Sequence, residues 1–315
     1  MNHPRILVTG GLGYIGSILT EHLVSQGYRT TVLDNLLYGT EQGLRHLCSN
    51  NLFHFVRGDV RDVNLMQSLL NDHDTIIHLA AIVGMPACLN DPHLAKSVNL
   101  DSVKVLAQLA QPCHLILYPN TNSGYGSTEG NVLCTEESPM KPISLYGQTK
   151  CKAESILMER ENTIVFRLAT VFGMSPRMRL DLLVNSFVYQ AVKEKYIVLF
   201  EQDFKRNFVH VRDVADCFLF AIHNFDSMKG NVFNLGLDDA NLTKLELAKK
   251  IQEQVPSLYI HSAPIGEDPD KRNYIVSSAK LAAFGFKATR TLESGIRELI
   301  KGYSMEARSL FRNVP

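Results

Sequence analysis

The sequence predicts an α/β protein built on a doubly wound parallel sheet, with a second, smaller mixed α/β lobe. Three observations lead to this prediction. Short apolar runs alternate with longer amphipathic segments over the first two-thirds of the chain, an order typical of a parallel sheet with helices on both faces. The apolar runs are continuous, as expected for strands that are covered on both sides. The alternation stops near residue 174, where an Arg-rich loop begins.

Each expected element follows from a particular stretch. The strand-like runs are RILVTG (5–10), TTVLD (30–34), FHFVRGD (53–59), TIIHLAA (75–81), HLILYP (114–119) and TIVFRLAT (163–170). Helical periodicity is present around 14–26, 93–110 and 144–160. After the Arg-rich loop we expect a helix, then short strands from about residue 229, a helix at 243–254 and a polar turn, GEDPDKRN. This organisation predicts a sheet domain over 1–173, to which 205–235 returns, and a smaller lobe formed by 174–204 and 236–315.

Composition excludes several classes of protein. The 315 residues are 45% hydrophobic, enough for a large core. Because 32 basic and 32 acidic side chains give zero net charge, nucleic acid is not an expected partner. The six cysteines are scattered without metal-ligand spacing, so we expect free thiols and no metal. The N-terminus enters a strand at once and no run approaches the roughly 20 apolar residues of a membrane span, so a soluble, cytoplasmic protein is expected.

The first turn carries the signal for a bound dinucleotide. In TGGLGYIG (9–16), Gly10, Gly13 and Gly16 follow a strand and open a helix, where backbone N–H groups and the helix dipole favour a pyrophosphate. Asp34 ends the next strand, and a carboxylate there accepts hydrogen bonds from ribose hydroxyls and repels a 2′-phosphate. The pattern therefore predicts NAD rather than NADP. Asp59 ends the third strand, where it would meet the adenine amino group, although turn or capping roles also explain both carboxylates.

The second signal is SLYGQTK (144–150). Tyr146 and Lys150 are four residues apart, so on a helix both lie on one face, and a neighbouring ammonium lowers the pKa of a phenol. Such a pair usually has no chemical meaning by itself. The order of glycine turn, acidic strand end, hydroxyl-rich turn NTNSGYG and then Tyr-x-x-x-Lys is what favours an acid/base pair.

With these motifs in place, the chain resembles the extended short-chain dehydrogenase/reductase family, and within it the enzymes of nucleotide-activated sugars. The resemblance covers nearly the whole chain and rests on TGGLGYIG, GDVRD, HLAA, VNL, NTNSGYG, YGQTK, RLATVFG, RNFVHVRDV and NLG. It implies a Rossmann-type NAD-binding domain and a nucleotide-sugar-binding lobe. It also implies that Tyr146 is the acid/base, that Lys150 orients it and that Thr121 hydrogen-bonds the reacting sugar oxygen. A plain turn hydroxyl is the alternative for Thr121.

The same resemblance implies a set of cofactor contacts. They are Gly10, Gly13, Tyr14, Ile15, Gly16, Asp34, Asn35, Asp59, Val60, Leu79, Ala80, Ala81, Asn99, Tyr146 and Lys150. Relatives that eliminate water carry Asp and Glu after the threonine, whereas this chain has Asn122 and Ser123, which we expect to contact the sugar. Neither can exchange protons as a carboxyl pair does, so dehydration is not expected.

Cations should meet the substrate diphosphate. Arg177, Arg179, Arg206 and Arg272 are candidates because guanidinium suits bidentate phosphate contact, and the resemblance favours Arg206 and Arg272, then Arg177. The nucleotide ribose would meet Asp268 and Asp270, for which a turn role is an equal alternative.

The narrower resemblance is to GDP-heptose C4 dehydrogenases of capsule synthesis, carried by YPNTNSGYG, FRLATVFGMSPRMRLDLLVN and GEDPDKRNY. It implies oxidation of a C4 hydroxyl. A 4-epimerase that reduces the keto sugar again is the alternative, and a non-catalytic NAD-binding sensor is a third interpretation. The family also implies a homodimer through a four-helix interface of the helices near 93–110 and 144–160, whose apolar faces core packing alone would equally explain.

Overall fold

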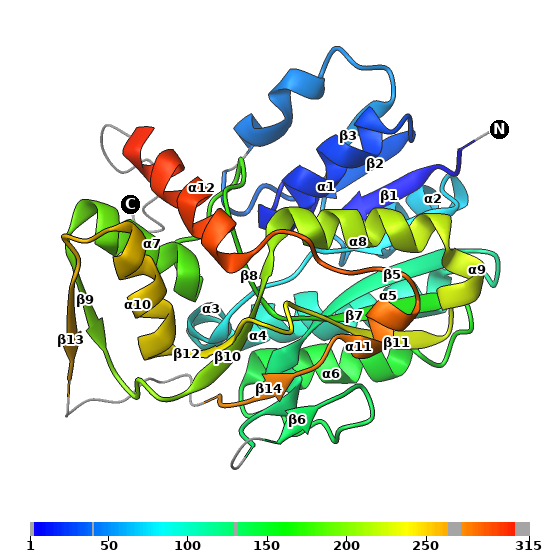
Figure 1. Ribbon diagram of the computed structural model, residues 1–315. Helices are drawn as coiled ribbons and strands as arrows, with labels where there is room; N and C mark the ends of the chain where they lie inside the picture. Colours follow the sequence, from blue (N-terminus) through cyan, green and yellow to red (C-terminus); the bar gives the residue numbers. More distant parts are fainter. Residues whose placement is uncertain (1–2, 40, 129–131, 264–271, 306–315) are drawn as a thin grey trace.

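The computed structural model describes residues 3–39, 41–128, 132–263 and 272–305, and its centre is a parallel sheet of seven strands (Figure 1). Across the sheet the order is β11 (Asn231–Leu235), β7 (Thr163–Leu168), β5 (Leu115–Thr121), β4 (Thr75–His78), β1 (Ile6–Thr9), β2 (Thr30–Asp34) and β3 (Phe53–Arg57). All neighbouring strands run parallel. The predicted doubly wound α/β fold is confirmed.

Helices cover both faces of this sheet. On one face lie α1 (Tyr14–Ser25) and α8 (Val211–His223), and on the other α2 (Val63–Asn71), α5 (Ser102–Leu109) and α6 (Leu145–Leu157). Within β1, Ile6 and Val8 face the first core and Leu7 the second, all with no exposed surface. Burying one such side chain contributes about 1.5–3 kcal/mol, which explains why these strands are apolar at every position.

The helical run expected over 93–110 is not one regular helix. It divides into α4 (Pro92–Lys96), a π-helical turn at Ser97–Asp101, and α5. Asp91 starts α4 by accepting the N–H of Leu94 at 2.8 Å. The remaining short elements are two 3₁₀ turns (Glu41–Leu47 and Asn122–Tyr125), α3 (Met85–Asn90), β6 (Leu133–Cys134), α9 (Phe225–Met228) and α11 (Ala279–Ala283).

The second lobe is built from small sheets and three longer helices. One sheet joins β12 (Asn241–Thr243), β10 (Lys205–His210) and β8 (Thr170–Phe172); β13 (Tyr259–Ser262) pairs with β9 (Tyr196–Leu199), and β14 (Ile275–Val276) with β6. The helices are α7 (Leu183–Lys193), α10 (Lys244–Gln254) and α12 (Leu292–Met305). Of the segment 205–235, α8 and β11 complete the large sheet domain. β10 pairs instead with β8 and β12, because β11 already occupies the sheet edge beside β7.

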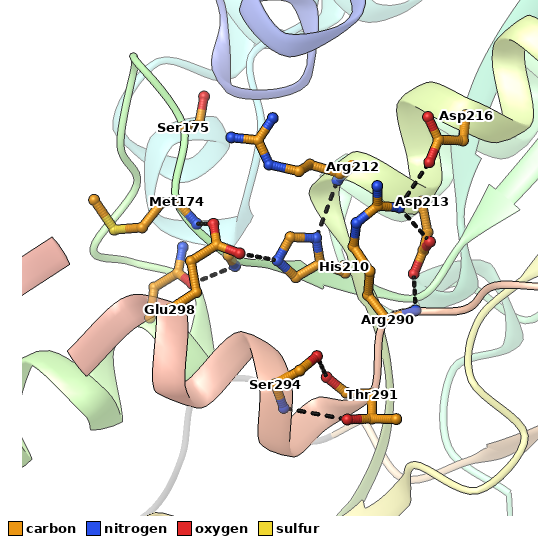
Figure 2. A network of polar contacts seen from close by, with 12 residues as sticks. Met174, Ser175, His210, Arg212, Asp213, Asp216, Arg290, Thr291, Ser294 and Glu298 are labelled. Atoms are coloured by element: carbon orange, nitrogen blue, oxygen red, sulfur yellow. Dashed lines mark hydrogen bonds and ion pairs between the residues drawn. The ribbon is translucent and has the colours of Figure 1, made fainter. Parts of the chain in front are cut away.

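Polar contacts fasten α12 to β10 and to the loop after β8 (Figure 2). His210 accepts the N–H of Arg212 at Nδ1, so its Nε2 donates to Glu298 at 3.0 Å. Glu298 in turn accepts the N–H of Met174 at 3.1 Å. This carboxylate therefore anchors the loop that follows β8. None of the helices in the described part of the chain combines the length and the apolar character that crossing a bilayer requires.

Candidate active site

The strands that carry the predicted site residues Asp34 and Thr121 end at one edge of the large sheet. Thr9, Asp34, His78 and Thr121 are the last residues of β1, β2, β4 and β5. Since parallel strands end at the same edge, the turns that follow them face a common crevice. The strand order reverses between β1 and β4, and ligands of such sheets bind at this switch point.

The glycine turn forms a backbone cradle at the start of α1. Gly10 has φ +69°, and a Cβ there would lie 2.8 Å from the backbone N and Cα of Ala80. At Gly16 a Cβ would collide with the carbonyl oxygen of Gly10. Gly13 begins the helix without a side-chain cap, so the first N–H groups of α1 face the crevice. A pyrophosphate fits this cradle, which has no side chains in its way.

We expect Gly10→Ala to abolish copurification of NAD and to lower the melting temperature, because the added methyl group meets backbone atoms that cannot move aside. Nucleotide released from purified protein, measured by ultraviolet absorbance, checks this. Gly27→Ala is the matched control. Gly27 also has a left-handed φ, +86°, but a Cβ there meets only the His3 ring at 3.9 Å. If both variants lost NAD equally, the loss would not be caused by the contact between a methyl group at Gly10 and the backbone of Ala80.

Asp34 has two roles in the structure. Its Oδ2 accepts the N–H of Leu12 at 3.1 Å and its Oδ1 accepts the N–H of Leu36 at 2.9 Å. The carboxylate thus holds the glycine turn and the turn after β2. Each oxygen keeps a further lone pair for a ribose hydroxyl, so the turn role and the cofactor role are compatible.

Other predicted cofactor residues hold the loops around the crevice. Asp59 accepts hydrogen bonds from Arg61 at 2.7 Å and from Asn35 at 3.2 Å, and the Arg61 guanidinium lowers its pKa to about 2. Buried Asn99 makes two hydrogen bonds to the backbone of Ile82, at 2.8 and 2.9 Å. It thereby fixes the strand exit that contains Leu79, Ala80 and Ala81. Arg61 had not been singled out in the sequence.

The remaining cofactor candidates lie on α1 and in the core. The Tyr14 hydroxyl donates to the carbonyl of Gly173 at 2.6 Å and accepts from Asn185 at 3.1 Å, so it joins α1 to the loop after β8. Ile15 packs against the core on the α1 side of the sheet, and Val60 is buried in the core on the other side.

The first of the predicted catalytic residues, Thr121, lies where β5 continues into the 3₁₀ turn Asn122–Tyr125. Thr121 Oγ1 accepts the N–H of Ser123 at 3.1 Å and donates to Ser123 Oγ at 2.9 Å. Arg272 also donates to Ser123 Oγ. Asn122 is fully buried, and its amide has no hydrogen-bond partner in the described part of the chain. The structure therefore brings Thr121, Ser123 and Arg272 together, whereas the Asn122 side chain is buried without such a contact.

Tyr146 and Lys150 lie in the first two turns of α6, which begins after Ser144 caps the helix by accepting the N–H of Gly147 at 3.1 Å. Burial raises the pKa of Tyr146 to about 12, and the cations that oppose this rise are Arg179 and Arg272. Burial lowers the pKa of Lys150 to about 7, and its Nζ lies 3.8 Å from the centroid of the Tyr118 ring. Desolvation of the Tyr146 phenol therefore outweighs the nearby positive charges.

The arginines predicted to meet the substrate diphosphate have different surroundings. Arg177 lies over the Tyr38 ring at 4.6 Å, and the charged side chains that act on its guanidinium include Arg179 and Asp34. Arg206 is almost fully buried over the Tyr274 ring. Arg179, two residues after Arg177, is one of the two guanidinium groups, with Arg272, that lower the pKa of Tyr146. Asp268 and Asp270 lie outside the described residues.

The crevice fits NAD on its own geometry. The glycine cradle accepts a pyrophosphate, and Asp34 has lone pairs for a ribose. Lys150 is buried and, among the residues described, has no hydrogen-bond or ion-pair partner, so its ammonium is available to a ligand. Together the fold and the glycine cradle fit a dinucleotide-binding protein, and the predicted catalytic tyrosine and lysine lie on α6.

Comparison with known proteins assigns the chain to a family. Residues 6–236 match the NAD dependent epimerase/dehydratase family, and the chain belongs to it. A CDP-paratose 2-epimerase of Salmonella typhi is 26% identical, over 94% of this chain and 98% of its own. UDP-glucuronic acid decarboxylase 1 of Arabidopsis thaliana is 28% identical, over 95% of this chain and 69% of its own.

The fold is shared with solved structures. The UDP-glucuronic acid 4-epimerase of Bacillus cereus, in complex with UDP-glucuronic acid and NAD, superposes with a TM-score of 0.84 at 22% identity, over 95% of this chain and 99% of that one. The resemblance noted from the motifs is thus confirmed for the family and for NAD. The chain is an NAD-dependent enzyme of the epimerase/dehydratase type, and the GDP-heptose group remains a prediction.

Proposed function

We propose that this enzyme oxidises the C4 hydroxyl of a nucleotide-activated sugar, a GDP-linked heptose, and releases the keto sugar. The observation that carries the proposal is the turn after β5, where Thr121 is present without an acidic pair behind it. Asn122 is fully buried, and Ser123 is engaged by Thr121 and Arg272. The described residues of this turn thus supply a hydroxyl for orientation and no carboxyl group for elimination.

In this proposal each side chain has a defined task. NAD, when bound, accepts the hydride from the sugar carbon. Tyr146 takes the proton of the sugar hydroxyl, and Thr121 turns its own hydroxyl from Ser123 to the sugar oxygen. Orientation of the reacting groups removes part of the barrier. The tyrosine proton is returned to solvent before the next turnover.

An epimerase is the second candidate, and it shares the oxidation step. The kinship to a CDP-paratose 2-epimerase and the common fold with a UDP-glucuronic acid 4-epimerase support it equally. In that case the keto sugar turns over in the crevice and is reduced on its other face. Substrate phosphates would meet Arg206 and Arg272. We also propose a homodimer in which the segments around α5 and α6 pack against the same segments of a second copy.

Product analysis separates the two candidates. Purified protein is incubated with GDP-heptose, or with UDP- or dTDP-hexoses as controls, at trace NAD, and the products are followed by NMR. We expect a keto sugar in an amount that matches the enzyme-bound NAD and rises only when an electron acceptor such as a 2-keto acid is added. A C4-inverted sugar formed over many turnovers would contradict the net dehydrogenase and establish the epimerase.

A further inference from the structure

Lys150 is a buried lysine without a counter-charge in contact. The residue is only 3% exposed, and no residue in the described part of the chain forms an ion pair or a hydrogen bond with its ammonium. Glu154, one helical turn further along α6, pairs with Arg167 at 2.6 Å instead. Because burial penalises the charged form of a lysine, a neutral group has to support this ammonium if it is to stay charged.

The neutral group in contact with the ammonium is the ring of Tyr118, on β5. Lys150 Nζ lies 3.8 Å from the centroid of this ring, and Tyr118 is only 1% exposed. The face of an aromatic ring carries partial negative charge and attracts a cation within about 6 Å of its centroid, most strongly where water is excluded. The contact therefore stabilises the charged lysine and, unlike a carboxylate, adds no opposing charge.

A neutral histidine on the neighbouring strand holds the Tyr118 ring. The Tyr118 ring stacks with the ring of His78, the last residue of β4, with 6.3 Å between centroids and 21° between planes. His78 is buried and fixed in turn, since its Nδ1 lies 3.0 Å from Thr9 Oγ1. Burial lowers the pKa of His78 to about 3, so this imidazole is neutral near pH 7. It therefore supplies no second cation to compete with Lys150 for the ring.

The hydroxyl of Tyr118 takes no part in the contact with Lys150. It is buried and has no hydrogen-bond partner among the described residues. Burial raises the pKa of this phenol well above its ordinary value, so it stays protonated. A buried hydroxyl without a partner costs free energy. The feature of Tyr118 that acts on Lys150 is consequently the ring, which phenylalanine also has.

We propose that Tyr118 is a positioning residue for Lys150: the face of its buried ring holds the ammonium one helical turn from Tyr146 and favours its charged form. This rests on the proposed function, in which Tyr146 takes the proton of the sugar hydroxyl and Lys150 orients it. The other titratable groups that act on Lys150 or on Tyr118 come from β4 and α6, and they are His78, Tyr146, Cys151 and Glu154.

The direction of the expected effect follows from charge. Burial already lowers the pKa of Lys150 to about 7, and the ring opposes this fall because it stabilises only the ammonium form. Removal of the ring should therefore lower the pKa of Lys150 further. The charged fraction is then lost at a lower pH, and less of the ammonium is present near pH 7.

The experiment is an NMR titration of Lys150 in NAD-loaded protein without substrate. Lysine with an isotope label at its ε carbon is incorporated, and the Lys150 signal is assigned by its absence in Lys150→Arg. We expect Tyr118→Leu, which removes the ring, to lower the Lys150 midpoint by about one unit, roughly a tenfold fall in the ratio of charged to neutral lysine. Tyr118→Phe, which keeps the ring, should leave the midpoint unchanged and melt at the same or a higher temperature.

Two further proteins separate the charge of the ring from its packing. Pentafluorophenylalanine at position 118 keeps the shape of the ring and reverses its charge distribution, so the midpoint should fall relative to Tyr118→Phe although the core stays filled. Phe166→Leu is the control for loss of a core ring: Phe166 is fully buried on β7 and packs against Phe218 and Phe233 on the other side of the sheet. It should lower the melting temperature and leave the Lys150 midpoint unchanged.

Equal midpoints in the fluorinated protein and in Tyr118→Phe would overturn the proposal, as would a fall in Phe166→Leu as large as that in Tyr118→Leu. A merely structural role of Tyr118 would lower the melting temperature without a selective shift of the Lys150 signal. Because no substrate is present, the titration is independent of whether the enzyme oxidises a GDP-heptose. Failure of the proposed function would appear only in the product analysis.

Discussion

Tyr146→Phe is expected to lower kcat by about 10²–10⁴-fold while NAD remains bound, because general acid–base catalysis contributes an effect of this size. The substitution removes only the hydroxyl of a side chain at the start of α6. The phenyl ring keeps its packing against the α2, α5 and α6 core, where Tyr146 is partly buried. Turnover of the nucleotide sugar and the amount of copurified NAD are measured on the same preparation.

Tyr189→Phe is the control for the loss of a tyrosine hydroxyl. Tyr189 lies on α7 with its ring edge-on to Tyr303 at 5.4 Å, in the second lobe. We expect its turnover to stay within a few-fold of the unchanged protein. If Tyr146→Phe retained full turnover, the assignment of the acid/base residue would be wrong, whatever the cofactor content.

Arg167→Met should reduce the free energy of unfolding by about 3–5 kcal/mol, the typical cost of removing one partner of a buried ion pair. Arg167 Nη2 lies 2.6 Å from Glu154 Oε1, and these side chains are only 7% and 10% exposed. Arg167 also donates to the Tyr125 hydroxyl at 3.0 Å, which donates to Asn234 at 2.6 Å. The substitution leaves the Glu154 carboxylate buried without its cation and releases a hydroxyl from the same network.

Chemical denaturation of this variant and of Arg5→Met provides the comparison. Arg5 pairs with Asp74 at 3.4 Å, and these side chains are 43% and 50% exposed. Exposed pairs contribute about 0–1 kcal/mol because water screens them. If both variants lost a similar amount of unfolding free energy, the stabilisation by the Arg167–Glu154 pair would not depend on its burial.

Glu154 connects this stability effect with the active site. It lies one helical turn after Lys150 on α6, and its carboxylate also accepts a hydrogen bond from Asn120, the residue before Thr121. The network therefore joins β5, β7 and the helix that carries Tyr146. We infer that the positions of Thr121 and Tyr146 relative to each other depend on it.

Local patterns in the sequence were sufficient for most of the fold. Continuous apolar runs such as TTVLD became sheet strands, and Gly10, Gly16 and Asp34 have the tight geometry that their spacing predicts. These features depend on neighbouring residues alone, so a single sequence reveals them. The division of the 93–110 run by a π-helical turn was not predictable, because the segment has helical periodicity throughout.

The electrostatics of the site depended on packing between distant segments. The sequence shows a lysine four residues from Tyr146 but not the burial of the phenol, which raises its pKa. Arg177 and Arg179 are chemically identical and two residues apart, yet Arg177 lies over the Tyr38 ring whereas Arg179 pairs with Asp181, a difference that the sequence does not show. Likewise, nothing in the string NTNSGYG indicates that Asn122 is buried while Ser123 meets Arg272.

Isotope transfer tests the central claim, hydride removal from the sugar C4 with Tyr146 as the base, most directly. GDP-heptose carrying deuterium at C4 is mixed with NAD-loaded protein, and after a single turnover the cofactor is released and examined by mass spectrometry and NMR. We expect deuterium on the reduced nicotinamide in the unchanged protein and almost none in Tyr146→Phe. Deuterium retained at C4 while reduced cofactor forms, or equal transfer in both proteins, would contradict this account.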